Sequence, residues 1–328
     1  MAGAASPRAG WLRAGWATWV GWWSHREPPH VLAVIRVLLS VVFLADFVTI
    51  GRLGLVEALF SPQAAGGFPD VLSRTPVPEL YRWFPQTQET AHAAWLGMIV
   101  AITCFGLGFL TPLAGLAWVL LSAQLSQTLP LGDRGIDMLC RDVVCILSVS
   151  ACGRAWSVDA WIARALGRPF AALQPAWPRH LLILQLAVMY FCAGIQKTAL
   201  AWGPLGGFSA LYLILQDPAI ARIPFAWLSR IYPVTQLASA ATIVFEWTAG
   251  LLPLVYWFRV TRTRPGRLRA FFNAKRPLRA WLTIGVLLHL GIASSMQLGV
   301  FPWAMLSLYP AFFHPEEWRI ALARRRFP

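Results

Sequence analysis

The stretch VLAVIRVLLSVVFLADFVTI (31–50) decides the fold class of this chain. It is almost entirely apolar, and an α-helix needs about 20 such residues to cross the hydrocarbon layer of a membrane. Comparable apolar runs lie near 91–109, 112–131, 138–154, 179–201, 234–258 and 280–299, and a shorter eighth run lies near 302–314. The sequence therefore predicts an all-α fold, a polytopic integral membrane bundle of about eight transmembrane spans.

The composition supports this class. Of the 328 residues, 57% are hydrophobic and 13% are charged, whereas soluble domains have about 45–50% and about 25%. Five cysteines lie in apolar stretches without the spacing of a zinc site, so we expect buried thiols, with a structural disulfide as the alternative. They are Cys104, Cys140, Cys145, Cys152 and Cys192. No metal site is expected.

The distribution of positive charge indicates the topology. The net charge of +14 comes mostly from arginines in loops between apolar runs, a pattern typical of cytoplasmic loops rather than of nucleic-acid binding. Eight spans place four basic segments on one side: the N-terminal segment, 154–179, 259–279 and the tail. We therefore expect a multi-pass protein of the cell membrane with both termini in the cytoplasm and with 51–90, 132–137 and 202–233 outside.

Three regions follow from these patterns. Residues 1–30 form a Trp-rich cytoplasmic or interfacial segment, in which 9–24 is expected to be a helix in the headgroup layer. Residues 31–314 form the transmembrane domain, and 315–328 form a basic cytoplasmic tail. A second surface helix is expected at 156–167, with Ser157 as its N-cap.

Ionisable residues within spans are the candidate functional residues, because each costs about 2.5–3.5 kcal/mol to insert. Two sets are spaced for pairing within the bundle, Arg36 with Asp46 and Asp137 with Arg141, and we expect them to hold the bundle together. The others are Asp142 in the fourth span, Lys197 in the fifth, Glu246 in the sixth and His289 in the seventh.

Lys197 differs from the other cations because it is the only lysine in any predicted span. A buried ammonium can lose its proton and act as a base, which a guanidinium cannot do at physiological pH. Ala193 and Gly194 are small and are expected to leave space beside it, and Tyr190 lies two turns earlier. The alternative is a lysine whose ammonium extends to the outer headgroups.

Five stretches resemble those of a known family. QLAVMYFCAGIQKTALAW (185–202) resembles the signature of the transmembrane domain of the vitamin-K-dependent γ-carboxylase and its bacterial relatives, the HTTM (horizontally transferred transmembrane) family. Supporting stretches follow in family order: GDRGIDMLCRD (132–142) with WSVDAW (156–161), FEWTAGLLP (245–253) and HLGIASSMQLGVFPWAML (289–306).

The resemblance implies a quinol-dependent, carboxylase-like enzyme. Lys197 stands at the position of the proposed base that deprotonates reduced vitamin K, the cofactor, before carbon dioxide is added to a glutamate of a peptide substrate. Glu246 and His289 are then expected to handle protons or to orient the reactants. Gln185, Tyr190 and Trp202 are expected to bind the quinol in an outward-facing cavity in contact with membrane lipid.

A second function stays open on the same residues. The stretch QTLPLGDRGID (127–137) lacks the histidine that the carboxylase has near this connection, and we expect no counterpart of its lumenal peptide-binding region. The alternative is a non-catalytic membrane partner in peptide maturation or export. If there is a site, Gln185, Lys197, Glu246 and His289 should converge on it.

Overall fold

The computed structural model describes residues 7–70, 77–129 and 132–313, so the predicted tail at 315–328 lies outside the described ranges. The chain divides into two compact units. One comprises Met1–His180 with Pro310–Pro328, and the other comprises Leu181–Tyr309.

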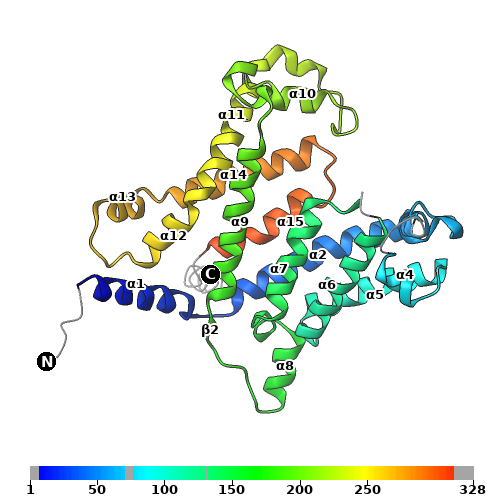
Figure 1. The fold of residues 1–328 in the computed structure, drawn as a ribbon, viewed down its shortest axis with the longest axis horizontal. Coiled ribbons are helices and arrows are strands. Elements are labelled where there is room, and N and C mark those ends of the chain that lie inside the picture. The colour runs from blue at the N-terminus through cyan, green and yellow to red at the C-terminus, as the bar shows by residue number, and fades with distance from the viewer. Residues whose placement is uncertain (1–6, 71–76, 130–131, 314–328) are drawn as a thin grey trace, which may run out of the picture. The chain divides into compact units, whose positions relative to one another are not determined.

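The first unit is built on four neighbouring helices (Figure 1). They are α2 (His30–Arg52), α5 (Gln88–Leu107), α6 (Thr111–Thr128) and α7 (Gly135–Ser148). Trp118 of α6 is buried at their centre, 5.5 Å from the ring of Phe43 on α2 and 5.6 Å from that of Phe105 on α5. Gly115 lets these helices approach, because a Cβ there would lie 2.7 Å from the Phe105 ring.

Short elements complete the first unit. They are α1 (Pro7–Trp23), β1 (Arg26–Glu27), α3 (Val56–Phe60), η1 (Gln63–Ala65), α4 (Glu79–Trp83), η3 (Cys152–Arg154), α8 (Val158–Ala165) and β2 (Gln174–Pro175). The two strands pair antiparallel, with Glu27 opposite Gln174. The buried carboxylate of Glu27 accepts from the guanidinium of Arg179.

The second unit contains the remaining helices. They are α9 (Trp177–Gln196, which begins in the first unit), η4 (Leu200–Trp202), η5 (Pro204–Gly206), α10 (Ala210–Gln216), η6 (Ala226–Ile231), α11 (Tyr232–Thr248), η7 (Ala249–Leu251), α12 (Leu252–Val260), α13 (Arg267–Lys275), α14 (Pro277–Ser295), α15 (Phe301–Leu308) and η8 (Tyr309–Phe312, which continues into the first unit after Tyr309). Figure 1 shows α10 beside one end of α11, and these two helices are in contact.

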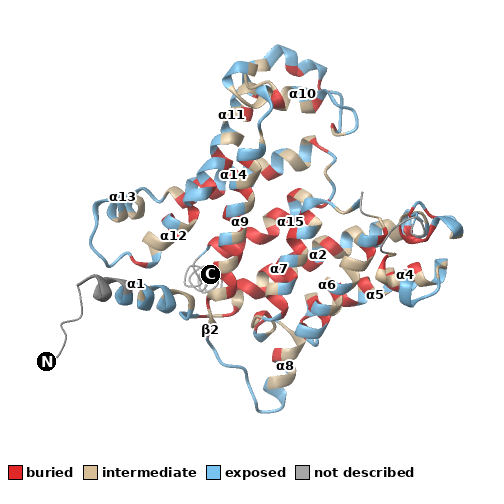
Figure 2. Cartoon of the chain, in the orientation of Figure 1, coloured by how far each residue is buried: buried red, intermediate tan, exposed pale blue. Residues whose placement is uncertain are grey.

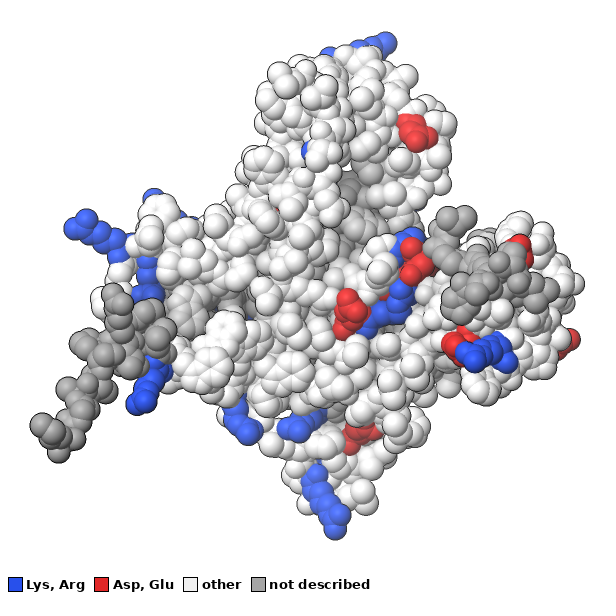
Figure 3. Space-filling view, viewed as in Figure 1, with Lys and Arg blue, Asp and Glu red and all other residues white. Residues whose placement is uncertain are grey.

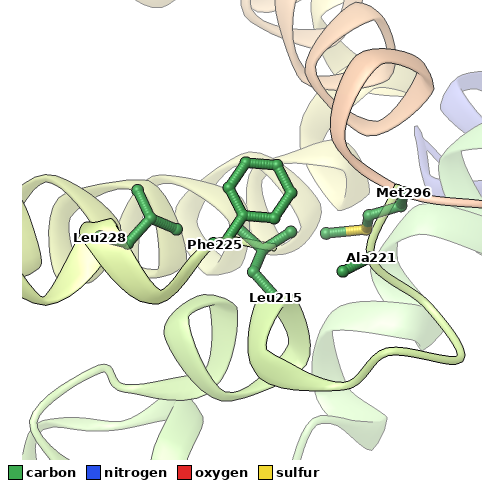
Figure 4. Packing of buried hydrophobic residues seen from close by; sticks show 5 residues of the cluster. All are labelled: Leu215, Ala221, Phe225, Leu228 and Met296. Carbon is green, nitrogen blue, oxygen red and sulfur yellow. The ribbon is translucent and has the colours of Figure 1, made fainter. Parts of the chain in front are cut away.

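A small apolar cluster fixes the segment between η5 and α11. Leu215, Phe225 and Leu228 pack with Ala221 and Met296 (Figure 4). Ala221 forms a β-bridge with Met296, and the backbone N–H of Arg222 donates to the carbonyl of Ser295 at 3.0 Å. This segment, predicted to be an outer connection, is therefore an ordered cap joined to the end of α14.

Five helical stretches among the described residues are long and apolar enough to cross a membrane. They are His30–Arg52, Gln88–Leu107, Trp177–Gln196, Ala226–Val260 and Pro277–Ser295. Each of the eight apolar runs contains a helix within its described residues, which confirms the all-α fold. Helices α6, α7 and α15 are too short or not apolar enough to be counted among the candidate spans. The count of eight crossings stays a prediction.

Lipid-facing surfaces account for the exposed apolar side chains. Outward residues of α2, α6 and α14, such as Val41, Leu113 and Leu287, are exposed, and Figure 2 shows such exposed faces along the helices. A soluble protein rarely exposes large continuous apolar surfaces, whereas hydrocarbon tolerates them. Only 28–50% of each candidate span is buried inside the structure.

The predicted surface helix at 156–167 is confirmed as α8. Ser157 is its N-cap, and its Oγ accepts from the backbone N–H of Ala160 at 3.0 Å. Asp159 in the first turn also serves a second helix, because its carboxylate accepts from the backbone N–H groups of Leu110 and Thr111, each at 2.9 Å. Asp159 thus caps the start of α6, which has no side-chain cap of its own.

Replacing Asp159 by alanine is expected to destabilise the first unit by about 1–2 kcal/mol, because the first N–H groups of α6 and the hydroxyl of Thr111 lose their acceptor. The free energy of unfolding in a denaturing-detergent titration measures this. Asp217→Ala, which removes only a local contact with the N–H of Ala219, is the control. Equal losses for both variants would contradict the capping role.

The predicted pairing of Arg36 with Asp46 is wrong. Arg36 does not bind Asp46: it donates to the backbone carbonyls of Cys152 and Ala155, at 2.7 and 3.4 Å, and of Trp156. One helix face places residues three or four apart together, and positions 36 and 46 are ten apart. The η3 turn instead brings carbonyl groups to Arg36, which is completely buried.

The predicted pairing of Asp137 with Arg141 is also wrong, because each residue binds a different partner. Arg134 precedes α7 and binds Asp137 at 2.8 Å and Asp46 at 3.3 Å. Arg141 binds Asp133 at 2.7 Å. Asp137 turns back toward the N-terminus of α7, where a carboxylate is favoured, and so is not available to Arg141. Arg134 thus links the start of α7 to Asp46 on α2, and the expected pair within α7 is replaced by these contacts.

The cysteines are free thiols in the structure, without a disulfide among them. Cys140 and Cys152 are buried, as expected, and Cys104 and Cys192 are half-buried. Cys145 is exposed, so the expectation of buried thiols is wrong there: it lies on an outward face of α7. The helix predicted at 9–24 is present as α1, and Trp19 and Trp22 contact each other with ring centroids 5.7 Å apart.

Candidate functional site

Lys197 lies just beyond the end of α9 rather than within a span. The helix ends at Gln196, and the N–H of Lys197 still donates to the carbonyl of Gly194 at 3.3 Å. The chain then turns through η4, which returns Trp202 toward the lysine. The prediction that the helix runs to residue 201 is therefore wrong, because this turn replaces its last part. A cation is favoured at a helix C-terminus.

The ammonium of Lys197 is held by a carboxylate and an indole. Its Nζ lies 2.6 Å from both carboxylate oxygens of Glu246 on α11 and 5.1 Å from the centre of the Trp202 ring. The Lys197 side chain is 21% exposed and that of Glu246 is 9% exposed. The structure thus brings three predicted site residues together, an ion pair with an indole beside it, and leaves the Lys197 side chain partly exposed.

Gly194 makes this pairing possible, for a reason that differs from the expected one. A Cβ at Gly194 would lie 2.9 Å from the Cβ of Glu246 and 2.6 Å from Cδ1 of Trp247. The space that the sequence predicts beside Lys197 is therefore filled by α11 at this position. The glycine lets α9 and α11 pack closely, and that contact sets Glu246 opposite Lys197.

A second polar set is buried in the same unit. The hydroxyl of Tyr190 lies 2.6 Å from Nε2 of His289 and 2.9 Å from the hydroxyl of Tyr309. The three side chains come from α9, α14 and η8 and are almost fully buried. Gly285, one turn before His289, makes room for the Tyr309 hydroxyl, which a Cβ there would overlap.

Aromatic rings surround Tyr190. Phe245 and Trp281 stack with centroids 4.3 Å apart, and the Tyr190 ring meets both edge to face at 5.1 and 5.5 Å. The indole N–H of Trp281 donates to the carbonyl of Phe245 at 3.0 Å. Because Phe245 directly precedes Glu246 on α11, this aromatic contact also fixes the position of the carboxylate.

Replacing Tyr190 by phenylalanine is expected to destabilise the second unit by about 1–3 kcal/mol. The change keeps the ring but removes the hydroxyl shared by His289 and Tyr309, and burying polar groups without partners is costly. Unfolding by denaturing detergent measures the loss. Tyr212→Phe is the matched control, because Tyr212 contacts Tyr232 through its ring. A smaller effect at Tyr190 than at Tyr212 would contradict this role.

The predicted site residues thus form two groups, Lys197 with Glu246 and Trp202, and Tyr190 with His289. Gln185 is half-buried on α9, and its predicted role in binding stays a prediction. Tyr309 is not among the predicted site residues. Its hydroxyl is a polar group within the apolar run 302–314, and the rule that selects charged residues in apolar runs would select it too if it were extended to hydroxyl groups.

Comparison with known families identifies the chain. A family model, the HTTM domain, matches residues 138–318. The chain belongs to the HTTM family. The HTTM match includes Lys197, Glu246, His289 and both polar sets described above. No curated protein and no solved structure matches the chain. Together with its long apolar helices, the HTTM domain makes this chain a multi-pass integral membrane protein.

Proposed function

We propose that this HTTM protein is a membrane enzyme in which Lys197 and Glu246 remove a proton from a lipid-soluble quinol. The observation that carries the proposal is the partly exposed ion pair, with Nζ of Lys197 at 2.6 Å from both oxygens of Glu246 and Trp202 beside it. Glu246 lies within the candidate span Ala226–Val260, where a carboxylate is costly to insert, and this favours a functional role.

The residues present suit a quinol. When bound, a reduced quinone supplies an aromatic ring and an acidic hydroxyl. The Trp202 indole offers a face for stacking, and the ammonium and the carboxylate offer a hydrogen-bond donor and an acceptor. Lys197 and Glu246 would hold the hydroxyl, and Trp202 would orient the ring.

Proton removal follows from the pairing. Glu246 would first accept a proton from the Lys197 ammonium, which would leave a neutral amine beside a neutral carboxylic acid. The Lys197 amine would then accept a proton from the hydroxyl of a bound quinol, and the resulting ammonium would offset the negative charge left on that oxygen. Glu246 keeps the first proton until it is released.

A carboxylase-like reaction on a glutamate of a peptide is the part of this proposal taken from the family resemblance. The second candidate is a non-catalytic partner in peptide maturation or export. It is favoured by one observation, that both oxygens of Glu246 already bind Lys197, as in a structural contact between α9 and α11.

Lys197→Arg separates the two candidates, because arginine keeps the charge but has no accessible neutral form. The assay is quinol consumption by the full chain in lipid nanodiscs, in air-saturated buffer with a glutamate-containing peptide and bicarbonate, because the quinol is consumed only when an oxidant, here oxygen, accepts its electrons. We expect Lys197→Arg to lose activity by about 10²–10⁴-fold, the usual contribution of a general base. Lys275→Arg, at the other lysine of the chain, is the matched control.

Yield and melting temperature of both variants serve as folding controls. An active Lys197→Arg protein, or a folded wild type that consumes no quinol, would favour the non-catalytic partner.

A further inference from the structure

The segment 259–279, which runs from the end of α12 through α13 to the first turn of α14, carries a strong positive charge. It contains eight basic residues and no acidic one, and no Asp or Glu occurs between Glu246 and Glu316. In the view of Figure 3, basic side chains gather over α12 and α13 with no acidic side chain among them. Such a surface is complementary to an anionic partner.

One face of α13 is fixed to α12. The Asn273 side chain donates to the carbonyl of Phe258 at 2.9 Å, and Nε of Arg269 donates to the hydroxyl of Thr261 at 3.0 Å. The rings of Phe258 and Phe272 lie 5.6 Å apart. At 100° per residue, positions 269, 272 and 273 share one face of the helix, so these contacts set its rotation.

The opposite face combines apolar and basic residues. Leu268 is 66% exposed and Phe271 is 56% exposed, and Arg267 beside them is also exposed. Two large apolar side chains next to a cation are typical of helices that lie in a membrane interface. In water this arrangement exposes apolar surface without a compensating gain.

We propose that α13 lies in the headgroup layer of an anionic membrane leaflet, with Leu268 and Phe271 inserted between acyl chains and the surrounding arginines on lipid phosphates. The helix sits between two candidate spans, Ala226–Val260 and Pro277–Ser295, and the second begins two residues after it. Its ends are therefore held at the membrane, which favours lipid over an acidic protein. Because arginine binds phosphate through two parallel N–H groups, anionic phospholipids should be enriched here.

Photo-crosslinking tests this surface in the full chain. Benzoylphenylalanine replaces Phe271, and the protein is reconstituted in nanodiscs with equal amounts of phosphatidylglycerol and phosphatidylcholine. Mass spectrometry then identifies the lipid adducts. Each basic residue near an anionic surface contributes about a fivefold preference. We expect lipid adducts at 271 in which phosphatidylglycerol exceeds phosphatidylcholine at least fivefold.

Leu287, exposed in the middle of α14, is the reference position for lipid contact without nearby charge. Adducts there should show no preference. Replacing Arg264, Arg267 and Arg276 by glutamine should bring the ratio at 271 close to that at 287, whereas Arg52→Gln with Arg230→Gln should not change it. Absence of lipid adducts at 271 when 287 forms them, or equal ratios at both positions in the unsubstituted chain, would overturn the proposal. Adducts with an acidic protein in native membranes would overturn it too.

Discussion

Replacing Glu246 by glutamine is expected to abolish quinol-dependent activity and to destabilise the protein by about 2–3 kcal/mol. The Lys197 ammonium loses the carboxylate that holds it at 2.6 Å. Removing one partner of a fully buried ion pair costs about 3–5 kcal/mol. The expected loss of unfolding free energy is smaller here because the Lys197 side chain is 21% exposed. Denaturing-detergent titration measures the stability, and quinol consumption measures the activity.

The control is Glu79→Gln, whose ion pair with Arg82 is exposed and should be worth less than about 1 kcal/mol. The double variant Lys197→Gln/Glu246→Gln should recover part of the lost stability, because no unpaired charge remains. Equal stability of Glu246→Gln and Glu79→Gln would mean that the pair does not hold α9 against α11.

Replacing Gly194 by valine is expected to displace α11 from α9 and to cost about 1–3 kcal/mol, the usual cost of overpacking. Even the Cβ would lie 2.6 Å from Trp247 and 2.9 Å from Glu246, and both contacts are with parts of side chains near the α11 backbone. Because the displacement moves Glu246, activity should fall with stability. Melting temperature and quinol consumption are the measurements.

Gly291→Ala is the matched control, because nothing lies within 4 Å of a Cβ at that position of α14. Alanine is also favoured over glycine in a helix, so no loss is expected. If Gly194→Val kept both full activity and the wild-type melting temperature, the close approach of α9 and α11 at this glycine would be contradicted.

The sequence predicts the helices well because their signal is local. Each apolar run is long enough to identify a helix by itself, and Ser157 marks the start of α8 through contacts within one turn. The sequence predicts the end of α9 too late because residues 199–202 are apolar again after Lys197 and Thr198, while the turn that stops the helix depends on where Trp202 packs.

The contacts of the candidate residues are harder to predict from the sequence than the candidate residues themselves. Lys197 and Glu246 stand out as charges in apolar runs, but their pairing depends on the register between α9 and α11, which Gly194 sets through contacts 52 and 53 residues away. Arg36 was assigned to Asp46 because no sequence rule identifies backbone carbonyls as partners, and the structure places those of Cys152 and Ala155 there. Tyr309 and His289 share the hydroxyl of Tyr190, and Gly285 makes room for the Tyr309 hydroxyl in this group.

Proton removal by Lys197 is most directly tested by an anaerobic titration at neutral pH. A hydroquinone with an isoprenoid chain is added to the wild type and to Lys197→Arg in nanodiscs, and the ultraviolet spectrum of its deprotonated form is recorded. The wild type should give this spectrum in proportion to the protein present, and Lys197→Arg should give the spectrum of empty nanodiscs. A wild-type spectrum identical to that of empty nanodiscs, or equal deprotonation by both proteins, would contradict the proposed role of Lys197.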